Sequence, residues 1–203
     1  ILLRHSSGTP APIGRDMGVP WDGRGESTRA LDPEALARLD WFVKCLKDEG
    51  IYIDFNLNVS RIFTAADGVR DAELLGFAKG VTYFDPRIIA LQKEYAAQLL
   101  GHTNPFTGLR YADDPAVALI EILNENSLLA CWHRGMLRGK STLGETWGDI
   151  PPSYGEDLKR MWNEYLRVKY GSREKLASAW GGDLGPEEDP AADTVRRLEP
   201  EEF

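Results

Sequence analysis

The 203-residue sequence has few of the residues that build metal centres and disulfide scaffolds. Its two cysteines, Cys45 and Cys131, lie 86 positions apart, and its three histidines form no HExxH pattern. A zinc module and a disulfide-dense scaffold are therefore excluded, and neither a metal nor another cofactor is expected. One cysteine pair does not determine the redox compartment.

Long apolar runs and an excess of basic charge are missing as well. The longest apolar run, residues 116–123, is interrupted by Glu121 and is far shorter than the ~20 residues of a membrane span. The formal net charge of −8 argues against nucleic acid and anionic membrane surfaces as partners. Residues 186–203 carry seven acids and two arginines, so most of this acidity belongs to a Pro-rich C-terminal segment. That composition is typical of a solvated tail.

A helix followed by a strand is predicted in the first third of the chain. Asp32 and Pro33 are typical of a helix start. An apolar stripe runs from there to Gly50, which suits the left-handed position after a helix. Residues 51–59 then alternate between apolar and polar side chains, which indicates a strand with one apolar and one polar face.

The same order of elements repeats in the middle of the chain. Asp85 and Pro86 begin a second predicted helix, and Gly101 lies just beyond its end. The nearly continuous apolar run 116–123 predicts a strand that is covered on both faces.

Further elements are expected at both ends. A third helix is predicted over residues 153–170, with Ser153 and Glu156 as a capping box, and a short helix over residues 172–180. Residues 1–5 read as the end of one more strand. Alternating strands and helices predict the α/β class with parallel strands.

The longest predicted loops all follow strands. They cover residues 6–31, 60–84 and 125–152, which are 26, 25 and 28 residues long. Long loops at the carboxyl ends of parallel strands are where TIM barrels and open α/β sheets build their active sites. We therefore look for function at these strand ends.

A barrel explains the pattern better than a nucleotide-binding sheet, because neither GxGxxG nor GxxxxGK[ST] is present. The polar face Asp54, Asn56 and Asn58 suits the lumen of a barrel. A complete barrel needs ~250 residues and eight strands, of which three are counted here. We expect a partial (β/α)8 TIM barrel over residues 1–185, with residues 186–203 as a tail or a loop leading to strands outside this chain. Both chain ends look like cuts through a longer protein.

The polar triplet Asn124-Glu125-Asn126 closes the apolar strand abruptly. A carboxylate beside a carboxamide at this position can perform general acid/base chemistry while the amide binds a substrate hydroxyl. The alternative is a polar strand end that meets water, with Asn124 or Asn126 as a turn residue.

Three segments carry a resemblance to a known family. They read LDPEALARLDWFVKCLKDEGIYIDFNLNVSR, FDPRIIALQKEYAAQLLGHTNPFTGLRYADDPAVALIEILNENSL and YLRVKYGSREKLASAW. Together they resemble bacterial cellulase-like members of the clan A glycoside hydrolases, the retaining enzymes that include the family 5 cellulases and mannanases. The resemblance implies a TIM-barrel hydrolase that cleaves O-glycosidic bonds in β-linked oligo- or polysaccharides.

The resemblance also implies roles for individual residues. Glu125 would be the general acid/base, and Asn124 would hydrogen-bond the sugar 2-hydroxyl. His5 and Asn58 fall where relatives place polar sugar-binding residues at strand ends. Apart from the resemblance, the place of Trp132 in the loop after Glu125 would let its indole face stack on a pyranose ring.

Each of these binding roles has a plainer alternative. His5 is equally well a capping or hydrogen-bonded histidine, and the tryptophans of the strand-end loops, Trp21, Trp132 and Trp147, can simply anchor their loops. Two positions depart from the family: Asn58 stands where many relatives have histidine, and Asn126 stands where many have proline.

The sequence supplies no nucleophile. A retaining mechanism needs a second carboxylate about 5–5.5 Å from the first, and the resemblance places it on a later strand. We therefore expect this fragment to be inactive alone. Two other functions remain open: a non-catalytic carbohydrate-binding protein on a decayed barrel, or a different barrel enzyme that uses Glu125 for proton transfer. The sugar, the linkage and the oligomeric state stay undetermined, although open sheet edges favour pairing with another copy. Relatives that degrade glycans are often exported, which leaves an extracellular or periplasmic location open.

Overall fold

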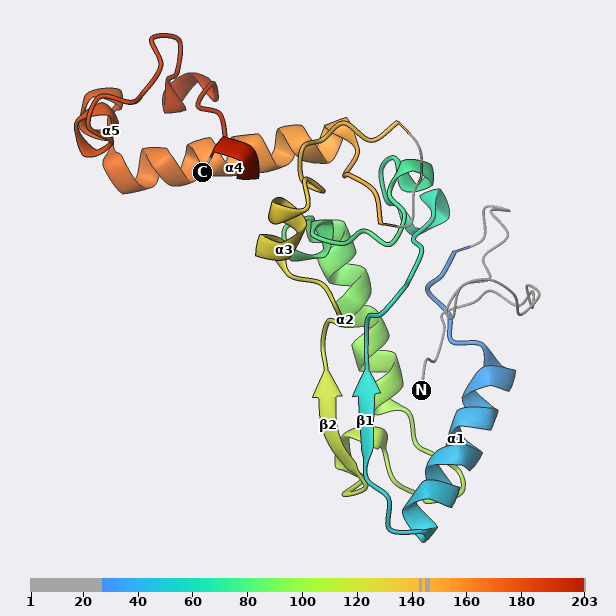
Figure 1. The fold of residues 1–203 in the computed structure, drawn as a ribbon. Helices are drawn as coiled ribbons and strands as arrows, with labels where there is room; N and C mark the ends of the chain where they lie inside the picture. Colours follow the sequence, from blue (N-terminus) through green and yellow to red (C-terminus); the bar gives the residue numbers. More distant parts are fainter. Residues whose placement is uncertain (1–26, 143, 145–146, 203) are drawn as a thin grey trace.

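A computed structural model describes residues 27–142, 144 and 147–202 (Figure 1). The described chain forms five α-helices and two strands, joined by short 3-10 turns. In chain order these are α1 (Pro33–Asp48), β1 (Ile53–Asn56), α2 (Pro86–Gly101), β2 (Val117–Glu121), α3 (Leu128–His133), α4 (Pro152–Tyr170) and α5 (Arg173–Ala179).

The two strands form a parallel sheet, as the α/β class predicts. Ile53 lies opposite Val117 and Asn56 opposite Glu121, with an irregularity after Ile53. Both strands are shorter than predicted, and the described residues contain no third strand. The predicted strand over residues 1–5 lies outside the described part. The parallel α/β arrangement is thus observed, whereas a barrel is not.

The first two helices begin where the sequence predicts, because their capping residues act locally. The Asp32 carboxylate accepts a hydrogen bond from the Ala35 amide at 2.7 Å, and Asp85 accepts one from Ile88 at 2.8 Å. A proline follows each cap at the first helical position. These caps fix where both helices start.

The helices α1 and α2 pack against one face of the sheet. The core between them consists of Leu39, Val43, Ile53, Phe55, Tyr95, Leu99, Tyr111 and Ala116. In β1 the predicted alternation is observed, since Ile53 and Phe55 are buried while Asp54 is exposed. The polar side of β1 therefore faces away from the helices.

The prediction that the second strand is covered on both faces is wrong. Ala118, Leu119, Ile120 and Ile122 are all exposed. The reason lies in the helical layer: α2 runs behind the sheet and α1 lies beyond β1, while the next long helix, α4, points away from β2 (Figure 1). This strand therefore has the apolar sequence of a covered strand without the cover.

The loops that follow the strands build a second core of their own. Residues from the loop after β1, from α2 and from the segment after β2 contribute to it: Phe63, Val69, Ala72, Leu75, Ala78, Val81, Ile88, Leu91, Cys131, Met136, Leu137, Ile150 and Tyr154. The long strand-end loops are consequently packed against each other. They can hold side chains in defined positions at the carboxyl end of the sheet.

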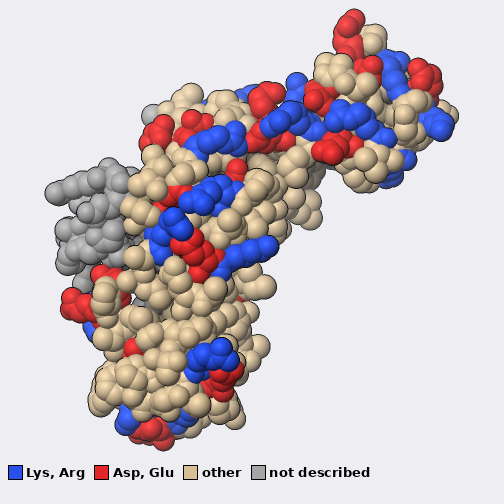
Figure 2. Space-filling model, turned by 180° about the vertical axis from the view of Figure 1, so that it is seen from behind, with Lys and Arg blue, Asp and Glu red and all other residues tan. Residues whose placement is uncertain are grey.

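The helix α4, the helix α5 and the segment that follows α5 form an arm, which projects from the rest of the molecule (Figure 1). Figure 2 shows the projection from behind, with acidic and basic side chains interspersed along it. The arm has a small core of Leu166, Leu176, Leu184 and Val195. The Asn163 side chain donates to the Val195 carbonyl at 2.9 Å and accepts from its amide at 3.0 Å. The C-terminal segment thus packs onto α4 through Val195.

The start of α4 also differs from its predicted capping box. The helix begins at Pro152, and no side chain caps it. The Ser153 hydroxyl instead donates to the carboxylate of Asp71, in the loop after β1. A contact between distant segments has replaced the local one.

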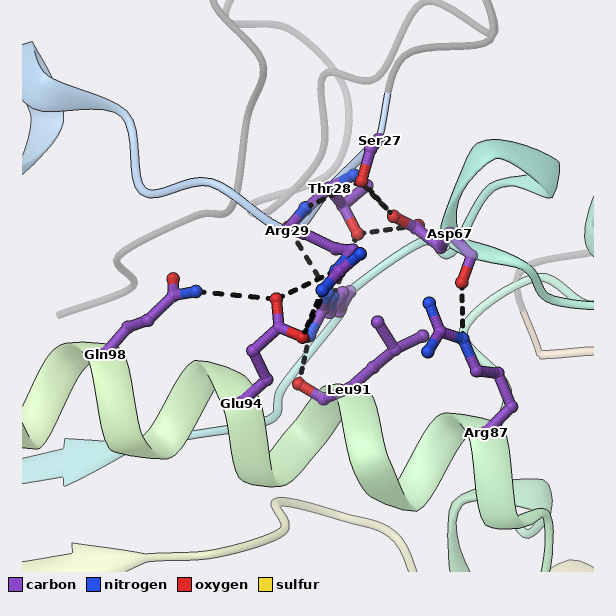
Figure 3. A network of polar contacts seen from close by, with 9 residues as sticks. Ser27, Thr28, Arg29, Asp67, Arg87, Leu91, Glu94 and Gln98 are labelled. Carbon is purple, nitrogen blue, oxygen red and sulfur yellow. Dashed lines mark hydrogen bonds and ion pairs between the residues drawn. The ribbon is translucent and has the colours of Figure 1, made fainter.

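A buried carboxylate, Asp67, organises the loop after β1 (Figure 3). It accepts hydrogen bonds from the Ser27 hydroxyl at 2.8 Å, and from the Thr28 amide and hydroxyl at 2.7 and 2.8 Å. The Thr64 amide donates to it at 2.8 Å. Burial alone would raise the pKa of Asp67, but the hydrogen bonds from Ser27, Thr64 and Thr28 outweigh it and lower the pKa.

Replacing Asp67 with asparagine is expected to destabilise the protein by about 2–3 kcal/mol at pH 7. The asparagine NH2 group takes the place of one carboxylate oxygen, so it faces hydrogen-bond donors that lose their acceptor. The folded pKa lies below the ~3.9 of an unfolded aspartate, so the unfolded chain binds more protons as the pH falls. The stabilisation is thus complete above about pH 5 and is lost as the pH falls through the folded pKa. Urea unfolding followed by circular dichroism at pH 7 and below about pH 3 measures both effects.

The matched control for this experiment is Asp113→Asn, because Asp113 is an exposed carboxylate paired with Arg110. It is expected to change stability by less than about 0.5 kcal/mol. Equal losses in the two variants would contradict the role given to Asp67.

Candidate functional site

Glu125 lies just beyond β2, at the carboxyl end of the parallel sheet, with its side chain exposed. Its backbone has a φ of +46°, in the left-handed region. That conformation costs a residue with a side chain roughly 1–2 kcal/mol. Strained residues of this kind persist only where the surroundings hold them, and they cluster at functional sites.

The residue before Glu125 is held through its backbone. The Asn124 amide donates to the Asn58 carbonyl at 3.0 Å, which extends the sheet contact beyond the strands. The Asn124 carbonyl accepts a hydrogen bond from the Lys79 ammonium at 2.7 Å. Both contacts use the backbone of Asn124, so neither occupies its side chain.

Asn126, the residue after Glu125, is buried and links two loops through hydrogen bonds. The Asn126 side chain accepts from the Gly80 amide at 2.9 Å and donates to the Thr82 hydroxyl at 2.7 Å. Its carbonyl accepts from the Tyr83 hydroxyl. These contacts give a structural reason for an asparagine where the resembling family often has proline.

Lys79 is the functional candidate that the sequence did not reveal. Lys79 is only 4% exposed, although its side chain carries a charge. Burial lowers the pKa of Lys79, while the nearby carboxylates of Glu125 and Glu121 act in the opposite direction. A lone lysine in the segment GFAKGVTYF was the available signal, but only the fold brings it to the end of β2.

Trp147 is an exposed aromatic side chain in contact with Lys79. The Lys79 ammonium lies 5.0 Å from the centre of its ring, and Phe77 meets the ring edge-on at 5.5 Å. Trp147 is nevertheless 46% exposed. An indole that is fixed by neighbouring side chains and still partly exposed is a suitable surface on which a sugar ring can stack.

The predicted stacking residue Trp132 is engaged elsewhere. Its indole N–H donates to the Leu198 carbonyl at 2.8 Å, and its ring packs against the core of the strand-end loops. Of the two alternatives that the sequence left open for Trp132, these contacts fit the anchoring one. Trp21 lies outside the described residues.

The other predicted binding residues are not gathered at Glu125 by their side chains. The Asn58 side chain is buried and donates to Gln92 of α2 at 2.9 Å. At the strand end Asn58 contributes its backbone carbonyl, which accepts from the Asn124 amide, and not its side chain. His5 lies outside the described residues. Asn124, Glu125, Lys79 and Trp147 therefore define the candidate site.

No second carboxylate suitable as a nucleophile accompanies Glu125 in the described residues. Glu121 lies within β2 and accepts a hydrogen bond from the Asn56 side chain. Among the described residues, no three His, Cys, Asp or Glu side chains form a group that could hold a metal ion. Over the same part of the chain, no helix has the length and apolar character needed to cross a membrane.

Comparison with protein-family models, with curated proteins and with solved structures gave no match.

Replacing Asn126 with alanine tests how the site is held. The Gly80 amide and the Thr82 hydroxyl lose their buried partner, which is expected to cost about 1–3 kcal/mol of stability. Hydrogen exchange at the Gly80 amide should accelerate by at least tenfold. His133→Ala, at an exposed position of α3, is the control and should leave that exchange rate unchanged. Slow exchange in Asn126→Ala would contradict the tie.

Proposed function

We propose that this chain is part of a retaining glycoside hydrolase, a partial (β/α)8 barrel that acts on β-linked glycans with Glu125 as the general acid/base. The observation that carries the proposal is the presentation of Glu125: an exposed carboxylate in a strained conformation at the carboxyl end of a parallel strand. The resemblance of the sequence to clan A glycoside hydrolases supplies the reaction class.

The surroundings of Glu125 suit a carbohydrate better than a phosphorylated or purely apolar substrate. An exposed indole, a carboxamide and a carboxylate offer one stacking surface and several groups for hydroxyl recognition. The nearby cation Lys79 is almost fully buried and donates to a backbone carbonyl, so it fixes the strand end. In this proposal Lys79 is a positioning residue.

The chemistry follows the double displacement of retaining enzymes. Glu125 gives its proton to the glycosidic oxygen as the bond from that oxygen to the anomeric carbon breaks. A second carboxylate, from outside the described residues, forms an ester at the anomeric carbon. Glu125, now a carboxylate, takes a proton from the water that breaks this ester, which restores both carboxyl groups. Asn124 would hold the sugar 2-hydroxyl during both steps.

Glu125→Gln tests the acid/base role in the polypeptide that also supplies the second carboxylate. Turnover of unactivated oligosaccharides should fall by about 10²–10⁴-fold, because the leaving oxygen loses its proton donor. Formation of the ester from an activated aryl glycoside should fall much less. Added azide attacks the ester without help from a base, so it should restore aryl-glycoside turnover and yield a glycosyl azide.

The control is Glu164→Gln, at an exposed position of α4, which should leave both rates unchanged. Equal rates for Glu125→Gln and the unaltered protein would contradict the acid/base role. Glycan binding without any turnover in the unaltered polypeptide would favour a decayed barrel. Loss of activity without azide rescue would favour a barrel enzyme that uses Glu125 for another proton transfer.

The proposed sugar platform can be tested in the 203-residue chain itself. Trp147→Ala should weaken binding of cellohexaose or mannohexaose by roughly tenfold, the equivalent of about 1.4 kcal/mol, in an NMR titration. Trp41 is a matched control, since it is 53% exposed, meets Phe106 edge-on at 5.3 Å and lies 5.5 Å from Lys44. Equal weakening by Trp41→Ala would mean that any exposed indole suffices, which contradicts a specific platform.

A further inference from the structure

The buried ammonium group of Lys79 lies at the junction of the two parts of the candidate site. It is 5.0 Å from the centre of the Trp147 ring and donates at 2.7 Å to the carbonyl of Asn124, which precedes Glu125. A cation over an indole face is attracted by the ring, and the attraction is stronger where water is excluded. One charged group therefore contacts both the proposed stacking surface and the strand end that carries the proposed acid/base.

A short strained segment holds this ammonium group in place. Phe77 and Lys79 both contact the Trp147 ring. Ala78, between them, is buried and has a φ of +54°, in the left-handed region. In the described chain, four residues other than glycine have a positive φ, and two of them, Ala78 and Glu125, are chain neighbours of the two partners in the hydrogen bond from Lys79 to the strand end. Such strain persists where the surroundings hold it, and it is common at functional sites.

The backbone near Trp147 is fixed separately, from within its own loop. Asp149 accepts hydrogen bonds from the backbone amides of residues 138, 139 and 140 at 2.8, 3.1 and 2.7 Å. These bonds close the loop two residues after Trp147, so they do not by themselves orient its indole. The side chains that meet the indole, Phe77 and Lys79, belong to the loop after β1.

We propose that Lys79 couples the two parts of the site, because its ammonium group fixes the Trp147 indole and the Asn124 carbonyl relative to each other. A sugar ring stacked on the indole is then aligned with the carboxyl group of Glu125, which is the geometry that proton transfer to a bound substrate requires. Lys79 is thus a positioning residue for the substrate as well as for the strand end. This inference rests on the proposed function, but the coupling itself can be measured without a glycan.

Hydrogen exchange at the Asn124 amide, which donates to the Asn58 carbonyl, tests the coupling in the ligand-free 203-residue chain. Lys79→Met keeps a long side chain without its charge. It should accelerate this exchange about tenfold, because the strand end loses a charged hydrogen bond. Trp147→Ala should accelerate it about threefold, since Lys79 loses its contact with the indole. In the double variant Trp147→Ala should add nothing, whereas independent effects would multiply.

A second lysine–tryptophan pair supplies matched controls. On α1 the Lys44 ammonium lies 5.5 Å from the centre of the Trp41 ring. Lys44→Met and Trp41→Ala should leave exchange at the Asn124 amide unchanged. Trp147→Phe keeps an aromatic ring beside Lys79 and should restore most of the slow exchange. Because Trp147 is half-exposed, its variants should keep the fold and still decide the test if circular dichroism shows that Lys79→Met does not fold.

An NMR titration with cellohexaose or mannohexaose tests the consequence for a glycan. Lys79→Met should weaken binding about threefold, and adding it to Trp147→Ala should weaken binding no further. Exchange at the Asn124 amide that Trp147→Ala leaves unchanged, or single effects that multiply in the double variant, would overturn the coupling. Coupled exchange rates in a chain that binds neither hexaose would instead overturn the proposed glycan site, and with it the alignment of a sugar by Lys79.

Discussion

The contact between the loop after β1 and the end of β2 is the constraint on which the candidate site depends. Two strands alone make a marginal sheet, and a strained glutamate at the end of one of them needs support from outside. Asn126 provides it through Gly80 and Thr82, and Lys79 provides it through the Asn124 carbonyl. Glu125 lies between these two attachments. Its exposure is thus combined with a fixed backbone, which acid/base chemistry requires.

The loop after β1, which makes this contact, is also fixed by hydrogen bonds to the segment before α1. Asp67 ties it to Ser27 and Thr28, and Arg61 links Thr28 to the Leu91 carbonyl of α2. The buried charge of Lys79 follows from the same packing, and its neighbours Glu125 and Glu121 partly offset the cost of burying it. The site therefore rests on long-range polar contacts around a small sheet.

Local signals in the sequence predicted the parts that local physics determines. The caps Asp32 and Asp85, with their following prolines, gave correct helix starts, and the alternation in β1 gave the buried face. The polar end of the second strand drew attention to Glu125. Two contacts that the sequence did not predict involve distant partners: Ser153 bonds to Asp71 rather than capping its helix, and the Asn58 side chain bonds to Gln92. Lys79 was missed for the same reason, since 45 residues separate it from Asn124.

The claim that the end of β2 is a carbohydrate site built around Glu125 has one most direct test. An epoxyalkyl β-glycoside of a disaccharide, tried as the cellobioside and the mannobioside, forms an ester with a carboxylate held beside the bound sugar. Peptide mass mapping of the 203-residue chain should find the label on Glu125, and an excess of the matching oligosaccharide should suppress it. Labelling spread over exposed carboxylates such as Asp113 and Glu164, without protection by the oligosaccharide, would contradict the claim.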